Sequence, residues 1–105
     1  MDDVHRDAAI QRFEYTYEMC WKMMHRHLTW ARVADVEKMG RRELFREAAR
    51  SALIDDPVRW MRHHEARNAT SHNYDERNAV KIFQHIRSFV DDAEGLLAEL
   101  KDRHA

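Results

Sequence analysis

Apolar side chains recur every three or four residues along the first part of the chain, and no glycine or proline interrupts them. The recurrence runs through Ile10, Phe13, Tyr17, Cys20, Trp21, Met24 and Leu28. Residues three and four apart lie on one side of an α-helix, so this stripe predicts a long amphipathic helix from Asp3 to about Ala31. A helix of this kind has to bury its stripe against other elements, which favours a helical bundle.

The cap and turn residues predict three further helices. A second helix is predicted over residues 41–54, where apolar residues again share one face. Asp56 is a suitable N-cap and Pro57 fits a first helical turn, so a third helix is predicted over residues 57–70. Asp75 is a suitable cap for the last helix. The predicted fold class is therefore all-α, an up-and-down antiparallel four-helix bundle.

Two apolar seams run along the last predicted helix. One seam contains Phe83, Ile86, Val90, Ala93, Leu97 and Leu100, and the other contains Ile82, Phe89 and Leu96. A helix with two seams is expected to pack on its own bundle with one and on something else with the other. We expect the seam of Ile82, Phe89 and Leu96 to contribute to a homodimer interface.

Composition and charge indicate one domain, residues 1–105, and exclude a strongly basic protein. The 105 residues include only 2 Gly and 1 Pro, and the formal net charge is -1. Any contact with nucleic acid must then come from a local patch. Seven arginines fall within one stretch, namely Arg41, Arg42, Arg46, Arg50, Arg59, Arg62 and Arg67. The alternative is that most of them are solvated and paired with nearby glutamates.

The cysteine and the hydropathy indicate a reduced, cytoplasmic setting. Cys20 is the single cysteine of the sequence and lies in an apolar stretch, so it is expected to be a buried thiol and not a nucleophile. The N-terminus is polar and acidic, unlike a signal peptide, and no apolar run is long enough for a membrane span.

The connection between the third and fourth predicted helices contains many polar and ionisable side chains. It contains Arg67, Asn68, Ser71, His72 and Tyr74, with the spacing Arg-x4-His-x-Tyr. On a continuous helix, residues five apart are rotated by about 140°. Arg67 and His72 therefore converge only if the helix ends between them, which the polar residues after position 70 favour.

This set of side chains suits cleavage of a phosphodiester without a metal. A histidine can take the proton of a ribose 2′-hydroxyl or protonate the leaving oxygen. An arginine can hold the phosphate, Asn68 can orient either group, and Tyr74 can bond the phosphate or stack on a base. No metal site is expected, because the 8 histidines show no zinc-type spacing with acidic or thiol partners. The alternative is a polar turn in which Arg67 pairs with an acid and Tyr74 packs on the last helix.

Several segments resemble known families. The segment "RNATSHNYDE" is similar to the Arg-x4-6-His motif of the HEPN families, here in the fuller form Arg-x4-His-x-Tyr. The segments "IQRFEYTYEMCWKMM" and "RRELFREAARSALIDDPVRWM" resemble consecutive helices of the nucleotidyltransferase substrate-binding proteins. The resemblance covers roughly residues 7–100. Family members carry another helix ahead of the first of these segments, and this chain begins almost at it, so we expect a second copy or a partner to cover the exposed face.

The resemblance implies a homodimer that forms a complex with a minimal nucleotidyltransferase. It implies a metal-independent ribonuclease toxin whose antitoxin, the nucleotidyltransferase, adenylylates the motif tyrosine. Carried over residue by residue, Arg67 and His72 are the catalytic pair and Asn68 assists them. Ser71 and Tyr74 contact the RNA substrate, and Tyr74 is the modification target. No cofactor is implied. The alternative is a non-catalytic subunit that binds a nucleotide or another substrate for the nucleotidyltransferase.

Overall fold

The computed structural model describes residues 3–71 and 75–104, and these residues form four α-helices and no strand. The elements are α1 (Asp3–Trp30), a short 3₁₀ segment η1 (Val36–Lys38), α2 (Arg41–Arg50), α3 (Pro57–Ala69) and α4 (Glu76–Arg103). The predicted all-α fold of four helices is confirmed. None of the described helices is both long enough and apolar enough to cross a membrane.

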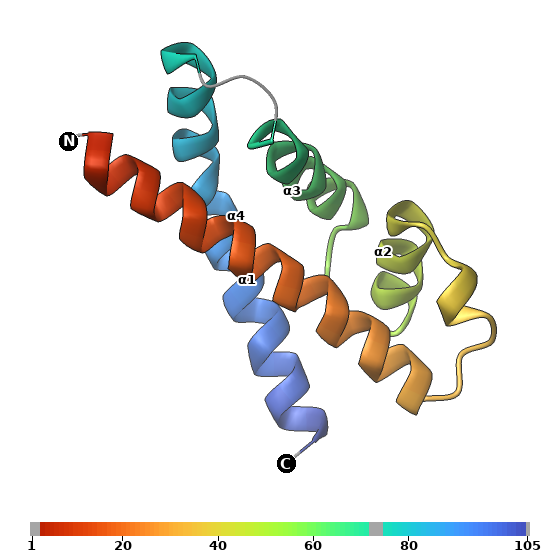
Figure 1. Cartoon of the computed structure of the whole chain (residues 1–105). Helices are drawn as coiled ribbons and strands as arrows, with labels where there is room; N and C mark the ends of the chain where they lie inside the picture. The colour runs from red at the N-terminus through yellow and green to blue at the C-terminus, as the bar shows by residue number, and fades with distance from the viewer. Residues whose placement is uncertain (1–2, 72–74, 105) are drawn as a thin grey trace.

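The two long helices, α1 and α4, run in the same direction and cross each other (Figure 1). Arg6 donates to Glu76 at 2.7 Å where both helices begin, and His27 contacts His104 at 2.8 Å where both end. The shorter helix α3 runs the opposite way. Its residue His64 contacts Tyr17 of α1, while its later turn reaches back to Glu14 of α1. The antiparallel relation therefore applies to α3 against its two long neighbours.

The helix starts follow the predicted caps, but α2 ends earlier than predicted. The Asp56 carboxylate accepts from the amides of Val58 and Arg59, and that of Asp75 accepts from Asn78. The prediction that α2 reaches Ile54 is wrong, because the helix ends at Arg50.

The early end of α2 has a clear backbone cause. Ala52 adopts a left-handed conformation with φ of 58°. Its amide donates to Ala49, and the next amide, that of Leu53, donates to Ala48, both at 2.9 Å. This pair of hydrogen bonds is the Schellman motif, which closes a helix. The arrangement turns Leu53 and Ile54 back into the core, where both are buried.

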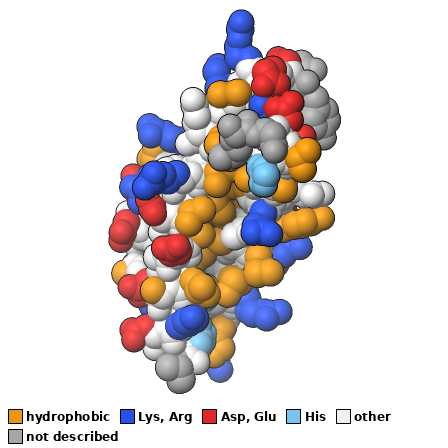
Figure 2. All heavy atoms as spheres, turned by 90° about the vertical axis from the view of Figure 1, so that its left-hand side faces the viewer, with side chains coloured by type: hydrophobic (Ala, Val, Ile, Leu, Met, Phe, Trp, Pro, Cys, Tyr) orange, Lys and Arg blue, Asp and Glu red, His pale blue; other side chains and the backbone are white. Residues whose placement is uncertain are grey.

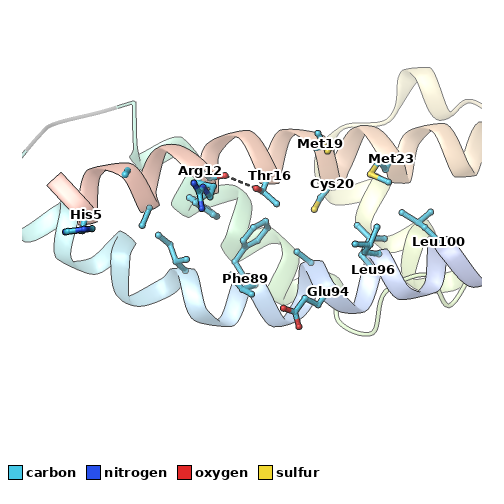
Figure 3. Close-up of a pocket in the computed structure, with 17 residues that line it drawn as sticks. His5, Arg12, Thr16, Met19, Cys20, Met23, Phe89, Glu94, Leu96 and Leu100 are labelled. Carbon is cyan, nitrogen blue, oxygen red and sulfur yellow. Dashed lines mark hydrogen bonds between the residues drawn. The ribbon is translucent and has the colours of Figure 1, made fainter. Parts of the chain in front are cut away.

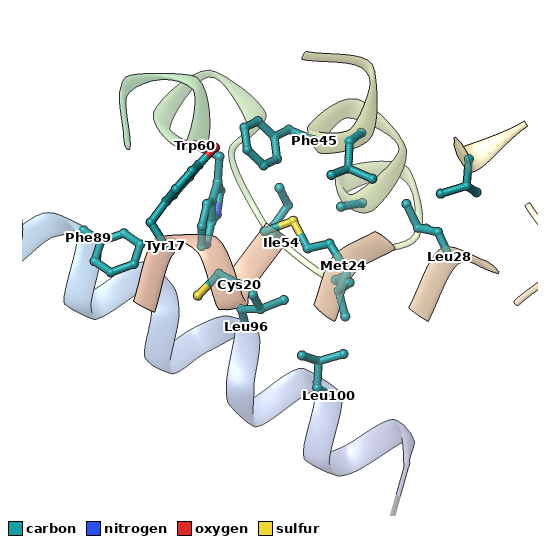
Figure 4. Packing of buried hydrophobic residues seen from close by; sticks show 14 of the residues in the cluster. Tyr17, Cys20, Met24, Leu28, Phe45, Ile54, Trp60, Phe89, Leu96 and Leu100 are labelled. Carbon is teal, nitrogen blue, oxygen red and sulfur yellow. The ribbon is translucent and has the colours of Figure 1, made fainter. Parts of the chain in front are cut away.

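The core lies where α1 and α4 meet the α2–α3 pair (Figure 4). Its largest fully buried side chains include Trp60, Tyr17, Phe45, Phe89 and Met24. Some of the aromatic rings meet edge to face, such as those of Phe13 and Phe89, whose centroids are 4.9 Å apart. Edge-to-face contacts of this kind add to the stability gained from burial alone.

The expectation about the two seams of α4 is wrong. Ile82, Phe89 and Leu96, which were expected to face a partner, are 5%, 1% and 2% exposed and belong to the core. In the other seam, Val90 and Leu97 are 42% and 44% exposed, whereas Leu100 is buried at its end. Periodicity placed both seams correctly on the helix but could not tell which of them faces inward.

This second seam of α4, from Ile86 to Leu100, forms one wall of an apolar groove against α1. The groove has a volume of about 610 Å³ and is lined from α1 by residues that include Phe13, Met19 and Cys20. Figure 2 shows hydrophobic side chains gathered along this face between charged ones. The close-up shows Phe89 and Leu96 on the side of α4 that faces α1, opposite Cys20 and Met23 of α1 (Figure 3). The groove is thus an apolar surface that the described chain leaves open.

Adjacent leucines on α4 test this assignment of the two seams. Leu96→Ala is expected to lower the free energy of unfolding by about 2–5 kcal/mol, because it leaves a cavity in the core. Leu97→Ala makes the same chemical change at a side chain that is 44% exposed, so a loss of under about 1 kcal/mol is expected. Urea unfolding of both variants measures the difference. Equal losses would show that the seams are assigned incorrectly.

Candidate functional site

The predicted site is at the end of α3, and the structure describes part of it. Arg67 and Asn68 lie in the last turn of α3, and Ser71 follows that turn. The prediction that Arg67 occupies a last helical turn is confirmed. His72 and Tyr74 lie outside the described residues, so their predicted roles stay predictions.

Arg67 is held against α1 by acidic and hydroxyl groups. Its Nε lies 3.5 Å from a carboxylate oxygen of Glu18, and its Nη1 lies 3.8 Å from one of Glu14. Nη1 also donates to the hydroxyl of Thr70 at 3.2 Å. The Arg67 side chain is 25% exposed, so solvent still reaches it. The pairing with acids that the polar-turn alternative expected is therefore present, and it places the guanidinium between α1 and α3.

Asn68 belongs to a second set of contacts that runs into the core. Its side-chain nitrogen lies 3.3 Å from Nε2 of His64, one helical turn earlier. Nδ1 of the same histidine lies 2.7 Å from the hydroxyl of Tyr17 on α1. Burial lowers the pKa of His64, and the positive charge of Arg41 lowers it further. Burial also raises the pKa of Tyr17 far above its ordinary value, so both groups are neutral near pH 7.

Short-range contacts fix the two ends of the segment between α3 and α4. The Ser71 hydroxyl donates to the backbone oxygen of Asn68 at 2.7 Å. The side chain of Asn78 on α4 donates to the backbone oxygen of Ala69 on α3 at 3.1 Å. This second bond joins α3 directly to α4. It therefore restrains the positions of Ser71 and Asp75, which precede and follow residues 72–74.

Sequence reasoning missed a buried charged cluster between α3 and α4. Arg59 donates to both carboxylate oxygens of Asp92, with Nε at 2.7 Å. Nε2 of the fully buried His63 lies 2.6 Å from the same carboxylate, and its Nδ1 lies 2.7 Å from Nε2 of His85. The one available signal was Asp92 itself, an acid placed between apolar positions of α4. A lone acid at such a position is far more often a solvated residue, so periodicity gave no reason to select it.

The pKa shifts in this cluster follow from its geometry. Burial lowers the pKa of His63, and the hydrogen bond to Asp92 only partly opposes that shift. Burial alone would raise the pKa of Asp92, but the hydrogen bonds from Arg59 and His63 outweigh it and keep the pKa below its ordinary value. The cluster therefore contains a carboxylate, a guanidinium and neutral imidazoles, with each buried charge paired as burial requires.

Among the described residues, the side chains near the end of α3 are hydrogen-bond donors, and neither a reactive thiol nor a metal site accompanies them. Burial raises the pKa of Cys20 to about 12, which makes it an inert thiol, as its apolar surroundings predicted. Among residues 3–71 and 75–104, no three His, Cys, Asp or Glu side chains are grouped as metal ligands would be.

Comparisons with known proteins agree on one family. Residues 1–102 match the family described as nucleotidyltransferase substrate binding protein like. The probable ribonuclease HepT of Haemophilus influenzae is 37% identical over 99 residues, which are 92% of this chain and 68% of that protein. A solved structure from the same organism, described as revealing the fold of a substrate-binding domain of a nucleotidyltransferase, superposes with a TM-score of 0.88. It is 36% identical and covers 94% of this chain and 75% of its own.

Proposed function

This chain belongs to the nucleotidyltransferase substrate-binding protein-like family, and on that premise we propose that it is a metal-independent ribonuclease that uses Arg67 and His72. The observation that carries the proposal is the position of Arg67 in the last turn of α3, five residues before His72 and beside Asn68. The 37% identity to a probable ribonuclease supports the same reaction class.

In this mechanism the chain supplies acid–base and electrostatic catalysis. His72 accepts the proton of the ribose 2′-hydroxyl, whose oxygen attacks the phosphorus. The bond from phosphorus to the 5′-oxygen breaks, and that oxygen takes up a proton. Arg67 and Asn68 donate to the phosphate oxygens, where negative charge builds up in the transition state. Ser71 and Tyr74 contact the substrate beside them. Glu14 and Glu18 keep the Arg67 guanidinium in place before RNA arrives.

The active form in this proposal is a homodimer that works with a minimal nucleotidyltransferase as its antitoxin. The apolar groove between α1 and α4 supports dimer formation, because an open apolar surface of this size is typical of an interaction site. Two copies of Arg67 facing one RNA would supply positive charge that a chain with a net charge of -1 lacks as a whole.

Purified protein is expected to cut RNA in the presence of EDTA. Arg67→Ala and His72→Ala should each lower the cleavage rate about 10²–10⁴-fold, the usual cost of losing one such group. Arg62→Ala, which removes an exposed arginine from the same helix, is the matched control and should cut at the wild-type rate. Helicity and sedimentation should be unchanged in all three variants.

Two outcomes would contradict the ribonuclease proposal. Cleavage by both alanine variants at the wild-type rate would assign the activity to another site or to a contaminant. A wild-type protein that binds the nucleotidyltransferase but cuts no RNA would favour the alternative, a non-catalytic subunit that presents a nucleotide or another substrate.

Tyr74 is the proposed point of control. It stands two residues after His72 in the sequence. Transfer of AMP from ATP to its phenol oxygen, with release of pyrophosphate, would add an anionic phosphate close to where the RNA phosphate binds. That phosphate would pair with Arg67 and repel the substrate, as phosphorylation does at other sites. The partner would thus inactivate the ribonuclease without unfolding it.

Intact mass measurement tests the role of Tyr74. Wild-type protein incubated with the partner nucleotidyltransferase, ATP and magnesium should gain the mass of one adenylate and lose its cleavage activity. Tyr74→Phe should gain no adenylate and stay active. Tyr15→Phe, which changes an exposed tyrosine of α1, should behave as the wild type does. Equal modification of Tyr74→Phe would exclude this tyrosine as the switch.

A further inference from the structure

Tyr17 and His64 form a line of contacts that starts in the core and ends at Asn68. The Tyr17 hydroxyl lies 2.7 Å from Nδ1 of His64, and Nε2 of His64 lies 3.3 Å from the side-chain nitrogen of Asn68. Tyr17 is 1% exposed, whereas Asn68 is exposed. The line therefore connects a rigid part of the bundle to a side chain that the proposed reaction uses at the surface.

The surroundings determine the direction of the hydrogen bonds along this line. Neutral imidazole has one N–H donor and one acceptor nitrogen, so the bond at Nδ1 decides what Nε2 does. The Tyr17 hydroxyl is buried and neutral. Arg41 is the cation that interacts most strongly with it, and a guanidinium can donate a hydrogen bond but cannot accept one. The hydroxyl proton is therefore donated to Nδ1 of His64. Nε2 then carries the imidazole proton and is a donor.

His64 stays neutral in this setting for reasons beyond its contact with Tyr17. Burial and the positive charges of Arg41 and Arg67 disfavour the imidazolium, and the carboxylates of Glu18 and Glu65 only partly offset them. These groups come from α1, α2 and α3, so three helices together determine the protonation state.

A donor at Nε2 requires an acceptor on Asn68. The amide oxygen and nitrogen of Asn68 are nearly equal in size, and a half-turn of the amide exchanges them at the 3.3 Å position. The oxygen then accepts from His64, and the NH₂ group points away from it. A phosphate accepts hydrogen bonds and donates none when fully ionised. Because the amide nitrogen has two hydrogens, this orientation leaves both of them free for RNA, whereas the opposite one would use one of them on His64.

We propose that Tyr17 and His64 are positioning residues that fix the Asn68 amide with its nitrogen directed toward a bound phosphodiester. The proposal rests on the ribonuclease function for the identity of that ligand. The orientation itself follows from the contacts of the free protein and can be measured without RNA.

The tautomer of His64 is the first test. A two-bond nitrogen–proton correlation spectrum of ¹⁵N-labelled protein should show His64 with its proton on Nε2 at pH 7.5. Tyr17→Phe removes the donor to Nδ1 and should mix the two tautomers, while Tyr15→Phe, the same change at an exposed position of α1, should leave the spectrum of His64 unchanged. A proton on Nδ1 in the wild type would overturn the proposed orientation.

Cleavage kinetics provide the second test. Tyr17→Phe is expected to lower kcat/KM about 2–10-fold, which is the usual value of one hydrogen bond. His64→Gln retains a side-chain donor and should cut faster than His64→Leu, which a purely space-filling role would not predict. Wild-type kinetics in both Tyr17→Phe and His64→Leu would overturn the positioning role. If the wild type cuts no RNA, the ribonuclease proposal fails by itself, and the tautomer still decides the orientation of Asn68.

Discussion

The structure depends on how α3 is fixed between the two long helices. His63 and His64 are adjacent in the sequence, and they contact opposite neighbours. His63 meets Asp92 of α4 at 2.6 Å, and His64 meets Tyr17 of α1 at 2.7 Å. Polar contacts of this kind are directional and do not survive a shift of the helix by one residue. They therefore determine how α3 is rotated about its axis and how far it is shifted along its neighbours. These two settings in turn determine where the side chains of Arg67 and Asn68 lie.

The ion pair between Arg59 of α3 and Asp92 of α4 contributes less to stability than the apolar contacts around α3 do. The Arg59 side chain is 40% exposed and that of Asp92 is 11% exposed, so solvent screening and the desolvation of the carboxylate both reduce the net attraction of this ion pair. Apolar contacts of Trp60 and Phe89 provide most of the driving force for packing, since both are 1% exposed. Directional polar contacts complement this packing, because apolar contacts alone would tolerate small rotations of α3 that move Arg67.

The sequence predicted the elements of the fold better than their environments. Caps at Asp56 and Asp75 located helix starts correctly, because the cap interaction is local. The end of α2 was missed because Ala52 takes a left-handed conformation that is unusual for alanine, and Leu53 directly after it is buried in the core. Which seam of α4 faces inward, and the partnership of Asp92 with His63, depend on contacts between distant residues that periodicity does not contain. At the site, the motif placed Arg67 in a last helical turn, but nothing in it pointed to Tyr17 or His64.

The central claim is that the end of α3 cuts RNA by acid–base chemistry on the ribose 2′-hydroxyl. The most direct measurement uses an RNA oligonucleotide that carries a single 2′-deoxy substitution at its main cleavage position, with EDTA present. The account predicts cleavage of the all-ribose strand to a product with a 2′,3′-cyclic phosphate end, and no cleavage at the substituted position. Cleavage at the 2′-deoxy position, or a complete loss of activity in EDTA, would contradict it.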